Sequence, residues 1–438
     1  PLLAFARLLN GLRRVGLSSA GIVTDMSRFN RFSHGVFGVF LDRVLSCSKL
    51  IAAGYWFHPS VIGALISGGL ISFIAAVWCS LLFLFPASDS VAPGYGNPEP
   101  VVPTASQCDV FEGSWIQYEG YPLYNASDCG FAERGFNCLA NGREDGGYLK
   151  WRWKPRNCVI PRFDPHLILE ELRGKRVVFV GDSLSRTQWE SMICMLMSGV
   201  KDKRSVYEIN GNEITKRARF LGVRFGSFNL TIEFFRSVFL VQHGRAPKRA
   251  PKRVKWALKL DKLDNTSEEW VNSDVLVFNS GHWWTREKLF EMGWYFQLGS
   301  SLKLGMPITT AFSIALKSWA LWVERRIDPS RTTVFFRTFE SSHRSNQGRR
   351  HCGVTGSPSW RMRGRNMSPI SDAIIKATKN MTVAVKVLHV TAMGALRSDG
   401  HVGRWGDNPS VPDCSHWCLP GVPDMWNEIL FFHLLSAH

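Results

Sequence analysis

The sequence lacks the cysteine spacing typical of a zinc hairpin, since no two of its ten cysteines have two residues between them. The nearest approach is Cys414 and Cys418, so we expect no metal site. No internal repeat is present, which argues against a solenoid or a propeller. Acidic residues are scarce, 36 against 53 Lys and Arg, which gives a formal charge of +17. This balance favours a polyanionic partner: nucleic acid, a membrane surface or an acidic polymer.

Charged residues are absent from VIGALISGGLISFIAAVWCSLLFLF, residues 61–85, which is long enough to cross a bilayer core of about 30 Å as a helix. The preceding segment, 1–60, is too long for an ordinary signal peptide, so we interpret 61–85 as a signal anchor and not as a buried helix. The positive-inside rule places the tail in the cytosol and the rest of the chain in a lumen. The basic residues of the tail are Arg7, Arg13, Arg14, Arg28, Arg31, Arg43 and Lys49. The first residue is Pro1 instead of Met, as expected if the native start lies upstream.

The cysteine count agrees with a lumenal location, because an even number follows the span and disulfides form in oxidising compartments. These eight are Cys108, Cys129, Cys138, Cys158, Cys194, Cys352, Cys414 and Cys418. Five N-x-S/T sequons are potential glycosylation sites there: Asn125, Asn229, Asn265, Asn366 and Asn380. Residues 86–107 are rich in Pro, Gly and Ser, which indicates a stem. The cysteine-dense segment 108–165 is predicted to be a disulfide-stapled subdomain.

Residues 166–438 have the alternating pattern of an α/β domain. Four short hydrophobic runs predict strands of a parallel sheet buried on both faces: 176–180, 274–279, 332–338 and 385–390. Amphipathic stretches at 190–197, 308–327 and 369–380 predict helices between them. The segment 228–241 is predicted to add an antiparallel excursion. We therefore expect a three-layer sandwich with a central parallel sheet, whose ligand site lies beyond the carboxyl ends of the strands.

The stretch VVFVGDSLSRTQ places Ser183 directly after a predicted strand and at the start of a helix. A serine there has a free backbone N–H beside the positive end of the helix dipole, which suits a nucleophile, although Asp182 or Ser183 can also be a simple helix cap. The hydroxyl needs a base, normally a histidine held by a carboxylate. Two pairs qualify: Asp413 with His416, three residues apart on one helical turn or tight loop, and Asp399 with His401.

A second strand end lies in FNSGHWW, residues 278–284, and the residues from Asn279 to Trp284 are expected at the same rim. Asn279, with Gly281, is predicted to donate to an oxyanion beside the Ser183 N–H. Trp283 and Trp284 are candidate platforms for sugar rings, or core residues. The basic run 243–264 holds only one interleaved aromatic, Trp256, so we interpret it as a solvated loop or a track for an acidic polysaccharide and not as a nucleic-acid site.

Together these motifs resemble the plant trichome birefringence-like family of polysaccharide O-acetyltransferases, within the SGNH (GDSL-type) hydrolase-like superfamily. The resemblance spans about residues 108–435 and is carried by CDVFEGSWIQYEGYPLYNASDC, KWRWKPRNCVIPRFDP, VGDSLSRTQWES, DVLVFNSGHWW, LRSDGH and PDCSHWCLPGVPDMWNE. Two positions depart from the family pattern: Thr187 stands where many members have Asn, and Ser280 stands where they have Thr. The resemblance implies a Golgi type II membrane protein with a family-specific N-terminal domain.

Carried over by motif, Ser183 matches the nucleophile, and Asp413 and His416 complete the triad. Asn279 matches the third block of the superfamily pattern, and Gly226 is assigned to the second-block glycine. Asp182 and Arg186 flank the nucleophile and are expected to contact substrate. The resemblance also implies the pairs Cys108–Cys158 and Cys129–Cys194, which leaves three possible pairings for Cys138, Cys352, Cys414 and Cys418.

The implied activity is transfer of acetyl groups to hydroxyls of xylan, pectin or mannan through an acetyl-serine. The acetyl donor, acetyl-CoA or an acetylated intermediate, is a co-substrate and not a bound cofactor. Two alternatives remain open from the sequence: a carbohydrate acetyl esterase with the same triad, and a non-catalytic pectin-binding protein.

Overall fold

The computed structural model describes residues 108–340, 342–344, 352–353, 355–359 and 368–436. The predicted cytosolic tail, transmembrane helix and stem lie outside the described residues. Within the ranges described, no helix combines the length and the apolar character that a bilayer crossing requires.

A seven-stranded mixed sheet forms the centre of the fold. Its strand order is β13 (Val385–Leu388), β12 (Thr333–Arg337), β9 (Val275–Asn279), β3 (Arg176–Gly181), β6 (Leu230–Arg236), β5 (Phe220–Phe225) and β4 (Val206–Glu208). The first five strands are parallel, while β5 and β4 run antiparallel to their neighbours.

The prediction of a parallel central sheet was therefore wrong at one edge. The segment 228–241 contributes β6, which pairs parallel with β3 on one side and antiparallel with β5 on the other. Only residues 226–229 connect β5 to β6, and so short a connection joins antiparallel strands but not parallel ones.

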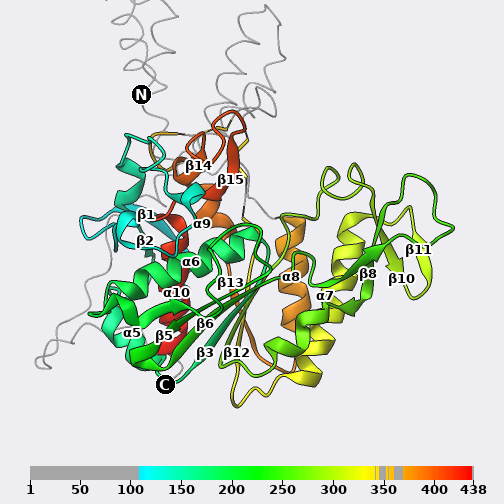
Figure 1. Cartoon of the computed structure of the whole chain (residues 1–438), viewed down its shortest axis with the longest axis horizontal. Coiled ribbons are helices and arrows are strands. Elements are labelled where there is room, and N and C mark those ends of the chain that lie inside the picture. Colours follow the sequence, from blue (N-terminus) through cyan, green and yellow to red (C-terminus); the bar gives the residue numbers. More distant parts are fainter. Residues whose placement is uncertain (1–107, 341, 345–351, 354, 360–367, 437–438) are drawn as a thin grey trace, which may run out of the picture. The chain divides into compact units, whose positions relative to one another are not determined.

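Two helical layers cover the sheet, which confirms the predicted α/β class. Residues Val177 and Phe179 of β3 belong to the core that includes α6 (Ser183–Met197) and α10 (Val422–Leu435). Val178 and Val180 face the opposite core with α7 (Ile308–Arg326) and α8 (Pro369–Lys379). Figure 1 shows the two helix pairs on opposite sides of the strands. Strands that bury both faces explain the nearly continuous apolar runs of the sequence.

Three smaller sheets surround this sandwich. One is the antiparallel pair β1 (Gly113–Gln117) and β2 (Trp151–Pro155) of the cysteine-rich segment. A second has the order β11 (Ser301–Lys303), β10 (Trp294–Leu298), β8 (Trp256–Leu263) and β7 (Val241–Arg245). The third pairs β14 (His401–Gly403) with β15 (Asp413–Trp417). The basic run 243–264 was interpreted above as a solvated loop or a track for an acidic polysaccharide. Its residues 246–255 form the connection between β7 and β8, and its remaining residues include the end of β7 and all of β8.

The remaining helices are short. They are α5 (Pro165–Glu171), α9 (Thr391–Ala395) and the 3-10 turns η2 (Ala126–Asp128), η3 (Arg134–Phe136), η4 (Gly147–Lys150), η5 (Lys203–Ser205), η6 (Gly226–Phe228), η7 (Asn265–Trp270) and η8 (Ser398–Gly400).

Candidate active site

Ser183 is the first residue of α6 and follows the carboxyl end of β3. Asp182 caps the helix, because its Oδ1 accepts a hydrogen bond of 3.0 Å from the backbone N–H of Leu184. The N–H of Ser183 itself has no acceptor within the helix, as for every first-turn residue. The turn thus presents, at the positive end of a helix, the hydroxyl of Ser183 and a backbone N–H that has no acceptor among the described residues.

Asn279 lies beside this turn at the end of β9, and its side chain is bonded to Asp182. Its Nδ2 donates to Asp182 Oδ1 at 3.1 Å, and its Oδ1 accepts from the Asp182 N–H at 3.2 Å. A Cβ at Gly181 would lie 2.0 Å from Asn279 Oδ1, so only glycine fits there. Asn279 therefore positions the turn, while its role as an oxyanion donor stays a prediction.

His416 joins the turn to β15. Its Nε2 lies 2.6 Å from Ser183 Oγ, and its Nδ1 lies 2.6 Å from Asp413 Oδ2. A carboxylate accepts, so Nδ1 carries the proton and Nε2 presents its lone pair to the serine hydroxyl. The structure thus brings the three predicted triad residues into one chain of hydrogen bonds, with the geometry of an activated serine.

The contact between Asp413 and His416 was expected on a helical turn or a tight loop, but both residues lie in β15. Asp413 Oδ1 accepts the backbone N–H groups of Ser415 and His416, each at 3.0 Å, which folds the carboxylate back over the following residues. Burial alone raises the pKa of Asp413, but the charge of His416 and these hydrogen bonds outweigh it and hold the pKa below its ordinary value. The carboxylate is therefore ionised whenever His416 takes a proton.

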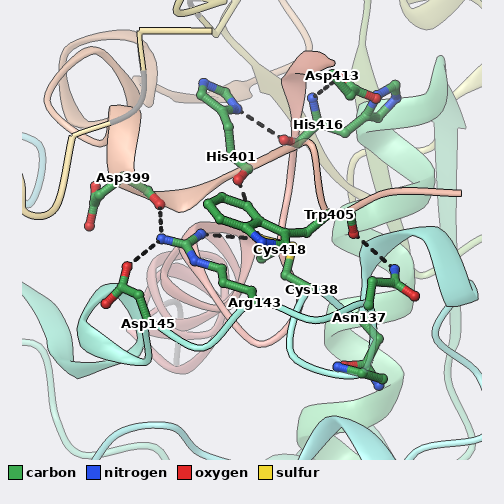
Figure 2. The surroundings of a disulfide bond; sticks show 12 residues. Asn137, Cys138, Arg143, Asp145, Asp399, His401, Trp405, Asp413, His416 and Cys418 are labelled. Carbon is green, nitrogen blue, oxygen red and sulfur yellow. Dashed lines mark hydrogen bonds and ion pairs between the residues drawn. A yellow bond between two sulfur atoms is a disulfide. The ribbon is translucent and has the colours of Figure 1, made fainter. Parts of the chain in front are cut away.

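The alternative pair, Asp399 with His401, does not form a catalytic base. The Asp399 carboxylate accepts two hydrogen bonds from the guanidinium of Arg397. His401 is fully buried, and its Nδ1 lies 3.0 Å from the backbone carbonyl oxygen of His416. Figure 2 shows the His401 ring pointing at the backbone carbonyl oxygen of His416. The His401 ring stacks on Trp417, with 3.9 Å between the ring centroids, and so supports the strand that carries His416.

Disulfides hold both cysteines that flank His416. Cys414 is bonded to Cys352, and Cys418 to Cys138, as Figure 2 shows for the second bridge. The two pairs implied by the family resemblance, Cys108–Cys158 and Cys129–Cys194, are also present. The second of these ties the N-terminal segment to α6, the helix that begins at Ser183. Disulfides thus hold both the helix that begins at Ser183 and the strand segment that carries His416.

A cleft of about 470 Å³ opens above the triad. Its lining includes Ser183, Asp413 and His416 together with Arg186, Phe136 and Arg236. Arg186 forms ion pairs with Glu133 and Glu190 and lies over the Phe136 ring, while the same ring stacks on His416. These contacts hold the Arg186 side chain in place in the lining of the cleft, where it was expected to contact substrate.

The structure separates the two neighbouring tryptophans Trp283 and Trp284. Trp284 is buried among Phe239, Phe296 and Phe312, so it is a core residue and not a sugar platform. Trp283 is half-buried and lines a second cleft.

Gly226 is at the wrong end of the sheet. It follows β5, whose last residue Phe225 pairs with Leu230 at the start of β6, whereas the other end of β6, Arg236, pairs with Gly181. The glycine assignment failed because the strand that carries the site edge is β6, whose carboxyl end is Arg236.

Arg236 and Phe136 are among the cleft residues that sequence reasoning missed. Arg236 is the last residue of the hydrophobic strand β6, a signal that the predicted excursion at 228–241 concealed. Phe136 lies in the cysteine-rich segment, where no periodic pattern marks it. Of the departures from the family pattern, Thr187 donates to the Ser183 carbonyl oxygen at 2.9 Å, and Ser280 accepts from Trp284 Nε1 at 3.0 Å.

Four of the five sequons, at Asn125, Asn229, Asn265 and Asn380, are exposed. Asn366 lies outside the described residues. The described part of the chain contains no group of three His, Cys, Asp or Glu residues placed to hold a metal ion.

Comparisons with known proteins agree with this geometry. A family model described as the GDSL/SGNH-like acyl-esterase family found in Pmr5 and Cas1p matches residues 160–433, and the PMR5 N-terminal domain matches residues 106–159. Among curated proteins of Arabidopsis thaliana, the chain is 57% identical to protein trichome birefringence-like 7 over 392 residues, which cover 89% of this chain and 87% of that protein. It is 42% identical to trichome birefringence-like 9 over 76% of this chain and 84% of that protein. It is 38% identical to protein trichome birefringence over 75% of this chain and 56% of that protein.

Proposed function

The chain belongs to the trichome birefringence-like family, and from this premise we propose that it is an O-acetyltransferase acting on a plant cell-wall polysaccharide through an acetyl-serine. Its GDSL/SGNH-like domain indicates acyl-transfer or acyl-ester chemistry. The observation that carries the proposal is the hydrogen-bonded series Ser183–His416–Asp413 in the lining of the cleft.

The first half of the reaction acetylates the serine. His416 Nε2 takes the hydroxyl proton as Ser183 Oγ attacks the carbonyl carbon of the acetyl donor. The tetrahedral oxyanion is stabilised by the Ser183 N–H and, in this proposal, by the Asn279 amide. As the donor leaves, it receives the proton from His416, and Asp413 stabilises the imidazolium in between.

The second half transfers the acetyl group. A sugar hydroxyl in the cleft loses its proton to His416 and attacks the acetyl-serine, and the proton returns to Ser183 Oγ as that bond breaks. The same triad performs hydrolysis when water attacks instead, so the outcome depends on whether the acceptor fills the cleft before water does.

The acetyl donor and the cellular compartment are also part of the proposal. The donor is acetyl-CoA or an acetylated intermediate, used as a co-substrate. The chain is proposed to be a single-pass type II protein of the Golgi membrane with its catalytic domain in the lumen. The predicted anchor and the exposed sequons support this topology.

The test is the intact mass of the deglycosylated chain after exposure to an activated acetyl ester, beside its Ser183→Ala variant. The proposal expects one added acetyl group that maps to Ser183, is absent from the variant and is discharged onto a polysaccharide acceptor. Discharge only to water, with acceptor present, would make the protein an esterase. A chain that folds normally, binds pectin and never acetylates Ser183 would make it a binding protein.

A further inference from the structure

A second cleft of about 470 Å³ lies beside the catalytic one, at the same carboxyl edge of the central sheet. Its walls come from the segment 217–219 before β5, from the end of β6, from the segments that follow β8 and β9, and from β7 and β10. A volume of this size is in the range of ligand sites in proteins. Nothing in the catalytic mechanism uses it.

Three arginines line the second cleft: Arg217, Arg219 and Arg236. Within the described residues none of them forms an ion pair. The acid that shares the cleft, Asp264, is already occupied, because Oδ1 accepts the N–H and hydroxyl of Thr266 and Oδ2 accepts the Ser237 hydroxyl. The cleft holds three positive charges against this single carboxylate, so positive charge is in excess.

Arg236 shows the effect of this crowding. Burial lowers its pKa, and the charges of Arg186 and Arg219 lower it further. An excess of like charge is destabilising, so the arrangement is relieved when an anion binds among the arginines. Arg236 is held in place by donating to the Lys216 carbonyl oxygen at 2.8 Å.

The opposite wall of the second cleft is aromatic. Phe239 contacts both Trp283 and Trp294, with ring centroids 6.2 Å and 5.6 Å apart. Trp283 and Trp294 are each only half-buried, so part of each indole faces the cleft. A partly exposed indole beside arginines is the combination that binds a sugar ring bearing a negative charge.

The two clefts are neighbours with a shared residue. Along the segment 216–219, Lys216 and Ala218 line the catalytic cleft, whereas Arg217 and Arg219 line the second one. Arg236 lines both. The two clefts are therefore adjacent, and a polymer that occupies the catalytic cleft needs only to extend past Arg236 to reach the second one.

We propose that the second cleft is a subsite for a uronate residue of the acceptor polymer, with Arg219, Arg217 and Arg236 binding its carboxylate and Trp283 contacting the sugar ring. This inference rests on the proposed function for its catalytic meaning, but its binding claim stands on the cleft alone. Such a subsite would make the protein selective for acidic polysaccharide over neutral glucan or mannan chains.

The first test measures binding without turnover. The full chain carrying Ser183→Ala is titrated calorimetrically with an oligogalacturonide and with its fully methyl-esterified form, which has the same sugars without the charge. The acid form is expected to bind about tenfold more tightly, the value of one charge-assisted hydrogen bond. Arg219→Ala should remove this preference, and Trp283→Ala should weaken both ligands.

Arg325→Ala is the matched control, because Arg325 is an exposed arginine at the far end of α7. Equal affinity for the two ligands would overturn the subsite. So would a preference that Arg325→Ala reduces as much as Arg219→Ala does, since that would be general attraction of a polyanion to a basic protein.

The second test uses the chain with Ser183 intact. Arg219→Ala is expected to leave the formation of acetyl-Ser183 unchanged and to raise KM for a uronate-bearing acceptor about tenfold, without changing KM for a neutral xylo-oligosaccharide. An equal rise for both acceptors would contradict uronate recognition. If no chain forms acetyl-Ser183, the proposed function fails, and the titration still decides the subsite.

Discussion

Nε2 of His416 lies 2.6 Å from Oγ of Ser183, although 233 residues separate the two in the chain. The serine is fixed by the turn between β3 and α6, and the histidine by a strand whose two flanking cysteines are both bridged. Neither partner stands on a free loop. The contact is therefore built in before substrate arrives, which is the condition for efficient proton transfer.

Asp413→Asn tests the role of the carboxylate. The amide oxygen can still accept the backbone N–H groups of Ser415 and His416, but its NH₂ would face His416 Nδ1. The imidazole would then carry its proton on Nε2, facing Ser183, and lose its function as a base. We expect kcat for acetyl transfer to fall about 10⁴-fold with little change in Tm.

Asp202→Asn is the control for that substitution. Asp202 is an exposed aspartate that also accepts a backbone N–H two residues ahead, from Arg204, but it lies remote from the triad. The Asp202→Asn variant should have the same activity as the unaltered chain. A rate for Asp413→Asn within tenfold of normal would exclude Asp413 from the triad.

Much of this site was readable from the sequence, because its parts follow strand ends. The apolar runs predicted β3, β9, β12 and β13, and the rule that ligands bind at carboxyl edges placed Ser183 and Asn279 together. The pairing of Asp413 with His416 was also accessible from its spacing. The sequence did not choose between this pair and Asp399 with His401, because both have a short spacing and the choice depends on which histidine is buried.

What the sequence could not provide was set by long-range packing. The antiparallel edge of the sheet depends on which neighbour β6 pairs with, and a hydrophobic strand pattern is the same for either direction. Trp283 and Trp284 are adjacent and chemically identical, yet the first lines a cleft and the second is buried. Cys138 pairs with Cys418 and Cys352 with Cys414. This is one of three possible pairings of these four cysteines, and their spacing in the sequence does not favour any of the three.

Asn279→Ala tests the proposed oxyanion donor. Loss of one donor lowers the rate of acetyl-serine formation about a hundredfold to a thousandfold. The substitution also removes both hydrogen bonds to Asp182, so the free energy of unfolding should fall by about 1–3 kcal/mol. Burst kinetics with an activated acetyl ester would measure the first effect and urea unfolding the second. A lower stability combined with a normal acetylation rate would leave Asn279 a positioning residue only.

The effect of the Cys352–Cys414 disulfide on catalysis can be distinguished from the stability that any disulfide provides. Cys352–Cys414 and Cys108–Cys158 close similar sequence separations, 62 and 50 residues, so chain entropy predicts stability losses that differ by only about 0.2 kcal/mol. Replacing either pair with alanine should cost about 2–5 kcal/mol. Only the first pair adjoins Asp413, so kcat should fall in that variant and stay near normal in the other, at a temperature where both are folded.

Asp424 predicts a pH dependence of stability. Burial raises its pKa to about 7, against the hydrogen bonds from Ser191, Gly421 and Tyr124. In the folded chain this carboxyl keeps its proton up to about that pH, whereas in the unfolded chain it is released near the ordinary value of 3.8. Between these values the folded state binds more protons, so stability falls as pH rises, by up to about 1.4 kcal/mol per pH unit from this group.

Asp424→Asn should remove that part of the slope. The variant will be less stable overall, since Asp424 also caps α10 by accepting the Gly421 N–H at 2.8 Å, and for this reason the slope and not the absolute stability is the readout. Urea unfolding at several pH values between 4.5 and 7.5, with disulfides intact, would measure it. Identical slopes in both chains would show that Asp424 is ionised throughout.

Gly181→Ala tests whether the turn that presents Ser183 depends on a missing side chain. A Cβ at this position would lie 2.0 Å from Asn279 Oδ1 and 2.6 Å from its backbone oxygen, and the backbone oxygen cannot move without shifting β9. We expect a stability loss of about 1–3 kcal/mol or more and a displaced Ser183. Gly305→Ala is the matched control, because no atom lies within 4 Å of its added Cβ. Thermal unfolding and acetylation of Ser183 would be measured in both, and a Gly181→Ala chain with normal Tm and normal acetylation would show that the site does not require the close approach of β3 and β9.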